Sequence, residues 1–287
     1  MGSTLTLGVI GGSGLYAMPG LEDLQTKQVE TTFGSPSDAI VCGKFGKTRL
    51  LFLPRHGVGH RIPPHKINYR ANILALKALG AQAIVSLSAV GSLREEIQPG
   101  DFVVIDQFID RTTSRPRTFF DEDVVCHVEF ADPIDATLHN ALTDGCKALG
   151  LRHHEAGSYV CIEGPQFSTR AESHLFRSWG ASVVGMTNLP EARLAREAEL
   201  PYATVALATD YDCWKEHEAS VSVKSVLEIL KQNAENAQRL LQTISQTLPD
   251  RADFEGKYSI RHSILSDLSK LGQASRTRLA PLIEKYC

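Results

Sequence analysis

The sequence predicts an α/β fold built around a largely parallel β-sheet. Short apolar runs rich in β-branched residues recur along the chain and end at Gly, Ser, Asp or Pro, which is typical of buried strands. Segments with a helical spacing of apolar residues lie between these runs. Strands that alternate with helices favour a sheet covered on both faces. Because the 287 residues contain neither an internal repeat nor a Pro- or Ser-rich linker, we expect one domain over residues 1–287.

The expected elements can be placed in chain order. Strands are predicted at 5–10, 49–53, 83–88, 102–106, 182–184 and 202–208. Helices are predicted at 67–79, 136–149 and 221–248, and Gly150 is a C-cap signal for the second of them. Residues 250–287 keep a helical spacing of apolar residues, so we expect a C-terminal helical extension there; the residues are Ile260, Ile264, Leu268 and Leu271.

Composition and charge exclude several classes of protein. Apolar residues make up 43% and charged residues 22% of the chain, which excludes a disordered protein, a collagen and a coiled coil. The net charge of −3 makes the chain a poor candidate for binding nucleic acid or an acidic membrane surface. Apolar runs are too short to span a membrane, and the N-terminal segment lacks the basic start of a signal peptide. Six Cys without a C-x-x-C pair favour free thiols in a reducing compartment, and so a cytoplasmic protein.

Chemistry is expected just after each predicted strand, because ligands of such folds collect at the carboxyl ends of the strands. After the first strand, residues 8–16 (GVIGGSGLY) could expose backbone N–H groups and the Ser13 hydroxyl to an anion. The segment matches neither G-x-G-x-x-G nor a Walker A motif, and a plain tight turn is the alternative.

A basic segment follows the second predicted strand. Arg55 offers the planar fork that suits a phosphate, and His56 and His60 follow it. The two His could pair on a metal only from a helix, and the glycines between them together with Pro63 and Pro64 argue against one, so we predict no metal site. A solvated loop is the alternative.

Two carboxylates end the last predicted strand. Asp210 and Asp212 are two residues apart and would point the same way in an extended chain. Either could keep a proton and donate it, or the pair could only cap a helix. Met186 and Phe167 carry weaker signals: the first could fill a core and the second could anchor a loop or stack on a planar ring. The sequence contains no G-x-S-x-G elbow, so a serine nucleophile is not indicated.

Taken together, these segments resemble a known family. Its features appear in order as GGSG (11–14), RHG (55–57), SAVGSLREEIQPGDFVVIDQFIDRT (88–112), IEGPQFSTRAES (162–173), GMTNLPEA (185–192) and ATDYDCWKEH (208–217). They closely resemble the methylthioadenosine phosphorylases of the trimeric purine nucleoside phosphorylase family, from about residue 7 to about residue 245. The resemblance implies cleavage of 5′-methylthioadenosine by phosphate to adenine and 5-methylthioribose 1-phosphate. It also implies a mixed, barrel-like twisted sheet flanked by helices, a homotrimer, and no metal or organic cofactor, with inorganic phosphate as co-substrate.

The resemblance further implies roles for individual residues. The phosphate site would consist of Ser13, Arg55, His56, Ser88, Ala89 and Thr187. Met186 resembles the ribose contact, Phe167 the residue that stacks on the base, and Asp210 with Asp212 the carboxylates that read adenine. Ser168 and Val223 resemble the positions that set purine and 5′-group preference, and His127 resembles a residue lent by a neighbouring subunit. Gly185 stands where the family commonly has Asn.

Two more residues are expected to bind substrate, and the C-terminal segment is left open. Leu227 shares a predicted helix face with Val223 and Val226, which suits an apolar methylthio group. We also assign His60 to the nucleoside. Residues 250–287 could close the 5′ pocket, even of a neighbouring subunit, or form a surface helix.

Several other functions are weighed against this one. The nearest is a broader purine nucleoside or methylthioinosine phosphorylase, against which Asp210 and Val223 argue. A hydrolase that uses water would not need the anion-binding set around Arg55. A dinucleotide-binding module would need the missing G-x-G-x-x-G. The paired carboxylates also argue against such a module. Protonation of purine N7 eases departure of the base, and Asp210, flanked by the apolar residues 206–208, could keep a proton and give it up.

Overall fold

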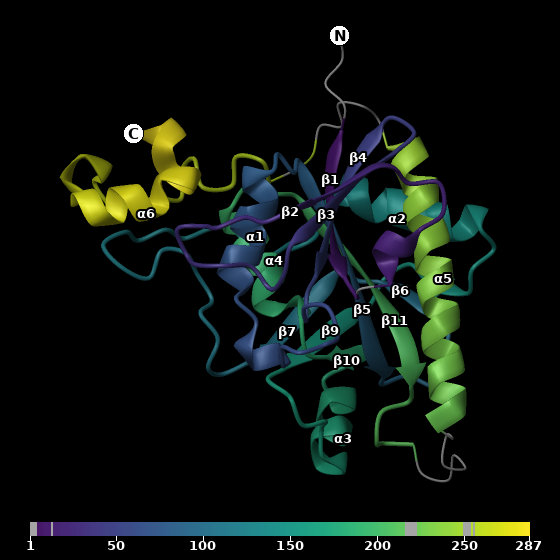
Figure 1. Ribbon diagram of the computed structural model, residues 1–287. Coiled ribbons are helices and arrows are strands. Elements are labelled where there is room, and N and C mark those ends of the chain that lie inside the picture. Colours follow the sequence, from purple (N-terminus) through teal and green to yellow (C-terminus); the bar gives the residue numbers. More distant parts are fainter. Residues whose placement is uncertain (1–4, 13, 216–222, 249–253, 255) are drawn as a thin grey trace.

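One mixed β-sheet organises the chain (Figure 1). The computed structural model describes residues 5–12, 14–215, 223–248, 254 and 256–287. Its strands are β1 (Thr6–Gly11), β2 (Glu22–Lys27), β3 (Ile40–Phe45), β4 (Thr48–Pro54), β5 (Ala83–Ser92), β6 (Phe102–Val104), β7 (Gln107–Arg111), β8 (His153–His154), β9 (Ser158–Ile162), β10 (Val183–Gly185) and β11 (Tyr202–Asp210). Its α-helices are α1 (Tyr69–Ala78), α2 (Ala136–Ala148), α3 (Arg170–Ser178), α4 (Asn188–Glu197), α5 (Val223–Thr247) and α6 (Gln273–Ile283).

The α/β class and the predicted strands and helices are confirmed. Each of the six predicted strands lies on an observed one, and the three predicted helices correspond to α1, α2 and α5. The prediction missed β2, β3, β7, β8 and β9, and the helices α3 and α4. The edge strand β2 shows why. All of its residues are exposed and Leu24 is its one apolar residue, so it contains no apolar run or alternation that would indicate a strand.

The centre of the sheet is parallel and part of it closes into a barrel. β5 pairs in parallel with β1 on one side and with β11 on the other. β11 also pairs with β6, which continues through Ile105 and Asp106 into β7. β7 pairs with β9, β9 with β10, and β10 returns to the end of β5. This ring of pairings confirms the mixed, barrel-like sheet that the resemblance implied.

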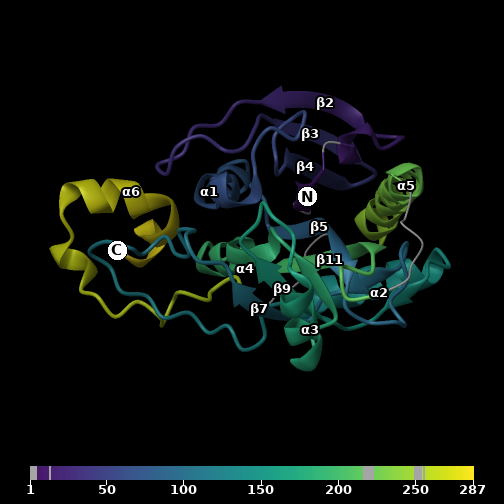
Figure 2. The same cartoon turned by 90° about the horizontal axis from the view of Figure 1, so that it is seen from below.

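Helices cover both sides of the sheet. α1 and α4 lie together on one side and α2 and α5 on the other (Figures 1 and 2). The long helix α5 buries a stripe that repeats every three or four residues, including Ala237, Leu241 and Ile244, each 0% exposed. Gly145 of α2 allows α5 to approach closely, because a Cβ there would lie 2.7 Å from Leu240 Cδ1. The helices thereby fix the sheet whose strand ends carry the site.

The C-terminal segment lies apart from the sheet beyond α1 (Figures 1 and 2). α6 forms within the predicted extension, but residues 260–271 do not continue it as a helix. They form turns, a bridge between Cys126 and Ile264, and a short 3₁₀-helix at Leu268–Lys270. Ile260 is nevertheless buried at 0% exposure, so this segment buries an apolar residue without forming a helix.

Two expectations about the whole chain can be compared with the structure. All six Cys are free thiols, and Cys42, Cys146 and Cys161 are buried. None of the described helices is long and apolar enough to cross a membrane.

Candidate active site

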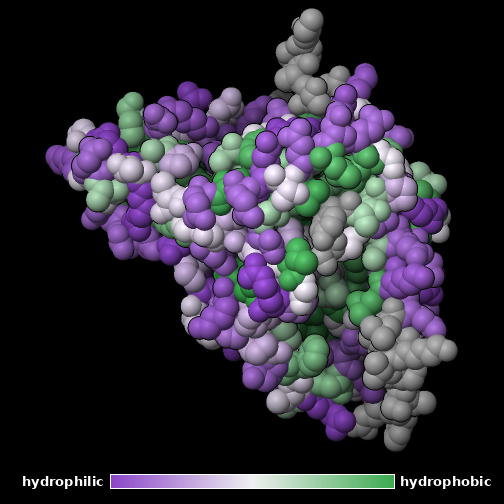
Figure 3. All heavy atoms as spheres, in the orientation of Figure 1, coloured by the Kyte–Doolittle hydropathy of each residue, from purple (hydrophilic) through white to green (hydrophobic). Residues whose placement is uncertain are grey.

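Most of the predicted site residues that the structure describes lie at or near the ends of β4, β5, β10 and β11. Figure 3 shows a hollow on this face over the lower halves of β5 and β11 as drawn in Figure 1, with hydrophobic side chains at its edge. Ala89 is exposed although the residues on either side of it in β5 are buried. An exposed alanine in the middle of a buried strand indicates open space in front of it, which a ligand could occupy.

A pair of hydroxyl groups lies at the end of the barrel strands. Ser88 Oγ of β5 and Thr187 Oγ1, just after β10, are 3.2 Å apart. Both residues are 5% exposed. Each hydroxyl can donate one proton, so the pair suits an anion, and the structure brings together these two predicted phosphate ligands from segments about 100 residues apart.

Arg55, directly after β4, is 2% exposed and already holds a buried counter-charge. Its Nε donates to Glu191 Oε2 at 2.7 Å, and its Nη2 donates to Glu191 Oε1 at 3.0 Å. Nη2 also donates to Ser86 Oγ, and Nη1 donates to Leu87 O. One N–H of Nη1 is thus left without a partner among the described residues. Burial lowers the pKa of Arg55 and the Glu191 carboxylate raises it, with a net rise, so Arg55 stays charged.

His56 is neutral at physiological pH. Burial lowers its pKa to about 4, helped by the nearby Arg55 cation. Its Nδ1 lies 2.9 Å from Ile62 O, and because a carbonyl only accepts, Nδ1 carries the ring proton and Nε2 is an acceptor. Such a ring suits a hydrogen phosphate that donates its own proton. His60 stacks on His56 with ring centroids 4.1 Å apart, which places it beside the phosphate residues.

The His56 environment predicts a pH-dependent stability. Its folded pKa of about 4 lies below its ordinary value of 6.5, so the unfolded chain binds more protons between these values. The free energy of unfolding should therefore decrease as the pH falls from 6.5 towards 4, because the proton then binds more readily to His56 of the unfolded chain. Urea unfolding midpoints are measured without phosphate at pH 7 and at pH 5 for the parent and for His56→Gln. We expect the decrease from pH 7 to pH 5 to be larger for the parent. Equal falls in both proteins would contradict this assignment.

The two carboxylates meet β5 at its end. Asp210 Oδ2 accepts from Thr209 Oγ1 at 2.7 Å, and Asp210 Oδ1 accepts from the backbone N–H of Asp212 at 2.8 Å. A Cβ on Gly91 would lie 3.1 Å from Asp210 Oδ1, so glycine allows the close approach. Burial raises the pKa of Asp212, and the charge of Asp210 raises it further. Neither carboxylate caps α5, which begins at Val223.

A buried arginine holds the segments that carry the predicted ribose and base contacts. Arg115 Nη1 donates to Met186 O and to Leu189 O, each at 2.7 Å. Its Nη2 donates to Ile162 O at 3.2 Å and to Glu163 O, and so ties the loop that contains Phe167 to Met186. Phe167 is 84% exposed, which leaves its ring available for stacking.

Ser168 and His127 lie in different surroundings. The Ser168 carbonyl accepts from the Cys213 thiol at 3.3 Å, which places this loop beside Asp212. His127 lies in the long segment between β7 and α2, where its backbone N–H donates to Ser263 O. Within the chain it is thus paired with the C-terminal segment, and its predicted role in a neighbouring subunit stays a prediction. Ser13 and the side chains of Val223 and Leu227 lie outside what the structure describes.

The comparisons with known proteins agree with one another. The family model described as the phosphorylase superfamily matches residues 6–246. The chain belongs to the phosphorylase superfamily. It is 49% identical over 281 residues to an S-methyl-5'-thioadenosine phosphorylase from Geobacter sulfurreducens, covering 98% of each chain. It is 52% identical over 248 residues to the enzyme of the same name from Hyperthermus butylicus, covering 86% of this chain and 90% of the relative.

Solved structures of the same superfamily superpose closely. A methylthioadenosine phosphorylase from an antarctic soil metagenomic library gives a TM-score of 0.93 at 42% identity, covering 98% of this chain and 99% of the other. A methylthioadenosine phosphorylase from Schistosoma mansoni, solved in complex with adenine, gives a TM-score of 0.85 at 37% identity, covering 91% and 99%. The fold is therefore that of this superfamily over nearly the whole chain.

Sequence reasoning missed the buried residues that support the site residues of this superfamily member through hydrogen bonds. They are Ser86, Arg115, Tyr159, Glu191 and Tyr202. Glu191 carries the one signal that could have found it. It is the one charged residue of GMTNLPEA, and a buried Arg55 requires a counter-charge.

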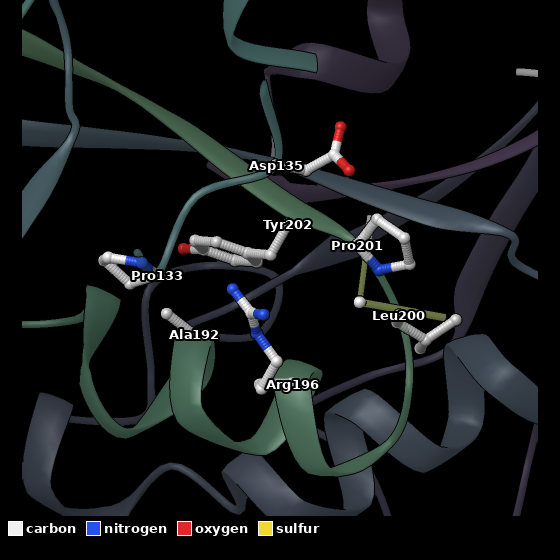
Figure 4. A pocket seen from close by; sticks show the side chains of 8 residues that line it. Pro133, Asp135, Ala192, Arg196, Leu200, Pro201 and Tyr202 are labelled. Carbon is white, nitrogen blue, oxygen red and sulfur yellow. The ribbon is translucent and has the colours of Figure 1, made fainter. Parts of the chain in front are cut away.

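A small cavity lies elsewhere. It is lined by Pro133, Asp135, Ala192, Arg196, Leu200, Pro201, Tyr202 and Gly256. Figure 4 shows Arg196 projecting from α4 towards Tyr202, which is the first residue of β11, whereas Asp210 is the last. The cavity is therefore at the opposite end of the strand from the candidate active site. Among the described residues, no group of three or more His, Cys, Asp or Glu side chains is arranged to hold a metal ion.

Proposed function

We propose that the chain cleaves 5′-methylthioadenosine with inorganic phosphate, giving adenine and 5-methylthioribose 1-phosphate. The observation that carries this proposal is the arrangement of Ser88 and Thr187 hydroxyls, 3.2 Å apart, in a chain that is 49% identical to an S-methyl-5'-thioadenosine phosphorylase over nearly its full length. The hydroxyl pair is a donor set for an anion, which a phosphorylase needs and a water-using hydrolase does not.

Phosphate serves two purposes in this reaction. As the C1′–N9 bond breaks, positive charge develops on the sugar ring, as in other glycosyl transfers. A phosphate dianion beside C1′ stabilises that charge and then forms the new C1′–O bond. We assign the phosphate to Ser88, Ala89, Thr187, Arg55 and His56, with Ser13 as a further candidate.

The purine leaves as a neutral base once N7 is protonated. Asp212, whose pKa is raised by burial, is suited to donate that proton, and Asp210 is suited to accept from the 6-amino group. Met186 would contact the ribose and Phe167 would stack on the base, with Ser168 and His60 nearby. Val223 and Leu227 would line the apolar slot for the methylthio group.

One assay tests this function. The protein is incubated with methylthioadenosine with and without phosphate, and the sugar product is identified by mass. We expect adenine release only with phosphate, and 5-methylthioribose 1-phosphate as the sugar. Release of free methylthioribose without phosphate would instead identify a hydrolase, and faster cleavage of methylthioinosine would identify a 6-oxopurine enzyme.

We further propose a cytoplasmic homotrimer that uses no metal or organic cofactor and serves purine and methionine salvage. The exposed position of His127, on a segment that pairs with residues 263–266, supports contact with a neighbouring subunit.

The homotrimer gives a measurable prediction. In sedimentation velocity at assay concentrations, we expect one species with three times the mass of the chain. His127→Ala should keep that mass and raise KM for methylthioadenosine about 3- to 10-fold, the effect of one lost hydrogen bond. A fully active monomer would contradict the shared site.

A further inference from the structure

A buried phenol lies directly behind the two hydroxyls of the site. Tyr159 of β9 is 0% exposed, and its ring contacts Phe108 edge to face with centroids 5.9 Å apart. β9 pairs in parallel with β10, so Tyr159 lies next to the strand that leads into Thr187. The hydroxyl end of Tyr159 reaches across β10 at Gly185.

Gly185 is a glycine because of this phenol. A Cβ at position 185 would lie 2.0 Å from the Tyr159 hydroxyl oxygen and 2.5 Å from Tyr159 Cζ. Contacts that short do not occur between real atoms, so any other residue would displace the ring. Gly185 has no left-handed backbone conformation, so conformational freedom does not explain it. The residue pair Tyr159 and Gly185 therefore acts as one unit.

The Tyr159 hydroxyl has two polar neighbours. It accepts a hydrogen bond from the backbone N–H of Thr187 at 3.3 Å. It also lies 3.2 Å from Ser88 Oγ, which in turn lies 3.2 Å from Thr187 Oγ1. The phenol thus contacts the backbone of one predicted phosphate ligand and the side chain of the other.

The number of protons in this cluster indicates which hydroxyl donates to which. Because the phenol oxygen accepts from Thr187 N–H, its own proton is free to be donated to Ser88 Oγ. Burial raises the pKa of Tyr159 to about 12, so the phenol keeps this proton at neutral pH. With a lone pair of Ser88 occupied from behind, Ser88 has one proton to donate, and its acceptors in the structure are Thr187 Oγ1 at 3.2 Å and Ala89 O at 3.5 Å. When Ser88 donates to Thr187 Oγ1, the Thr187 proton is directed to the open side, where an anion requires a donor, and a bound anion can take the Ser88 proton in place of the Ala89 carbonyl.

We propose that Tyr159, admitted by Gly185, is a positioning residue that orients the Ser88 and Thr187 hydroxyls as donors and thereby sets the affinity for phosphate. The inference rests on the proposed phosphorolysis. Tyr159 touches no reacting atom in this scheme, because it acts through Ser88 and Thr187.

Tyr159→Phe tests the proposal, since it removes only the hydroxyl and keeps the ring against Phe108. We expect KM for phosphate to rise about 3- to 10-fold, the effect of one hydrogen bond, while kcat and KM for methylthioadenosine change less than about twofold. In a Ser88→Ala background the same change should raise KM for phosphate clearly less, because one of the two partners through which Tyr159 acts is already gone and only the Thr187 N–H contact remains.

Tyr286→Phe is the matched control, because it also removes a phenol hydroxyl that donates to a protein group, Glu199 Oε1 at 2.6 Å, in the C-terminal segment. We expect its KM for phosphate to stay at the parental value. A Tyr159→Phe variant with parental KM for phosphate, or with an equal effect in the Ser88→Ala background, would overturn the inference. A parent that shows no phosphate-dependent cleavage would overturn the proposed function instead, and the inference with it.

A second variant pair keeps the test informative even where activity is low. Gly185→Ala should lower the thermal midpoint markedly in the parent, because its Cβ meets the Tyr159 hydroxyl. In a Tyr159→Leu background the shorter side chain leaves room, and Gly185→Ala should then cost little. Equal losses in both backgrounds would overturn the proposed Tyr159 and Gly185 unit.

Discussion

Glu191→Ala is expected to lower the free energy of unfolding by about 3–5 kcal/mol, the effect of leaving one partner of a buried ion pair uncompensated. Arg55 would remain buried after losing both of its hydrogen bonds to the carboxylate. Ser86 Oγ and Tyr202 OH would also lose their acceptor, since each donates to Glu191 Oε1 at 2.8 Å. Urea unfolding followed by circular dichroism, at equal protein concentrations, measures the loss.

Asp121→Ala is the matched control, because Asp121 pairs with Arg70 and Arg278 at the surface, where its side chain is 37% exposed. Its expected loss is below about 1 kcal/mol. A similarly small loss for Glu191→Ala would contradict the buried pair.

The double variant Arg55→Met/Glu191→Leu separates folding from phosphate binding. Replacing both charges by apolar side chains should restore most of the unfolding free energy, because no unpaired charge is then buried. Phosphorolysis should stay low, since the Arg55 cation is missing from the phosphate site. Recovery of parental KM for phosphate in the double variant would remove Arg55 from that site.

Local patterns made the central strands and three helices predictable. The strands β1, β4, β5 and β11 are largely apolar, because most of their residues are buried. The edge strand β2 carries no such run, since it has only one neighbour and is exposed along its length. Residues 260–271 were misread for a related reason: helical spacing also results when turns bury isolated apolar residues such as Ile260.

The residues of the candidate active site also divide into those that local sequence patterns predict and those that they do not. Residues at or just after strand ends, such as Asp210 and Arg55, were predictable because strand ends converge at one edge of a parallel sheet. Glu191 and Tyr159 were not, because their roles depend on contacts across 136 and 71 residues of sequence. Such pairs are set by how β9, β10 and α4 pack, and no local pattern encodes that packing.

Asp212→Asn is expected to lower kcat about 10²- to 10⁴-fold on methylthioadenosine and on methylthioinosine alike, the effect of losing a general acid. An amide cannot supply the proton that either purine needs at N7, and the raised pKa of Asp212 is lost with the carboxyl group. Asp144→Asn on the exposed surface of α2 is the matched control, with parental kinetics expected.

Asp210→Asn should change selectivity instead. Its carboxylate accepts from the 6-amino group of adenine but faces a lone pair on a 6-oxo purine, whereas the asparagine NH₂ donates to that oxygen. The structure leaves Asp210 room for this, because its two internal donors, Thr209 Oγ1 and the Asp212 N–H, occupy only part of its lone pairs. We expect the ratio of kcat/KM for methylthioadenosine over methylthioinosine to fall by about 10²-fold or more, since a buried mispaired polar group discriminates strongly. If Asp212→Asn moves this ratio and Asp210→Asn does not, the two carboxylates have exchanged roles: Asp212 reads the base and Asp210 is left to donate the proton.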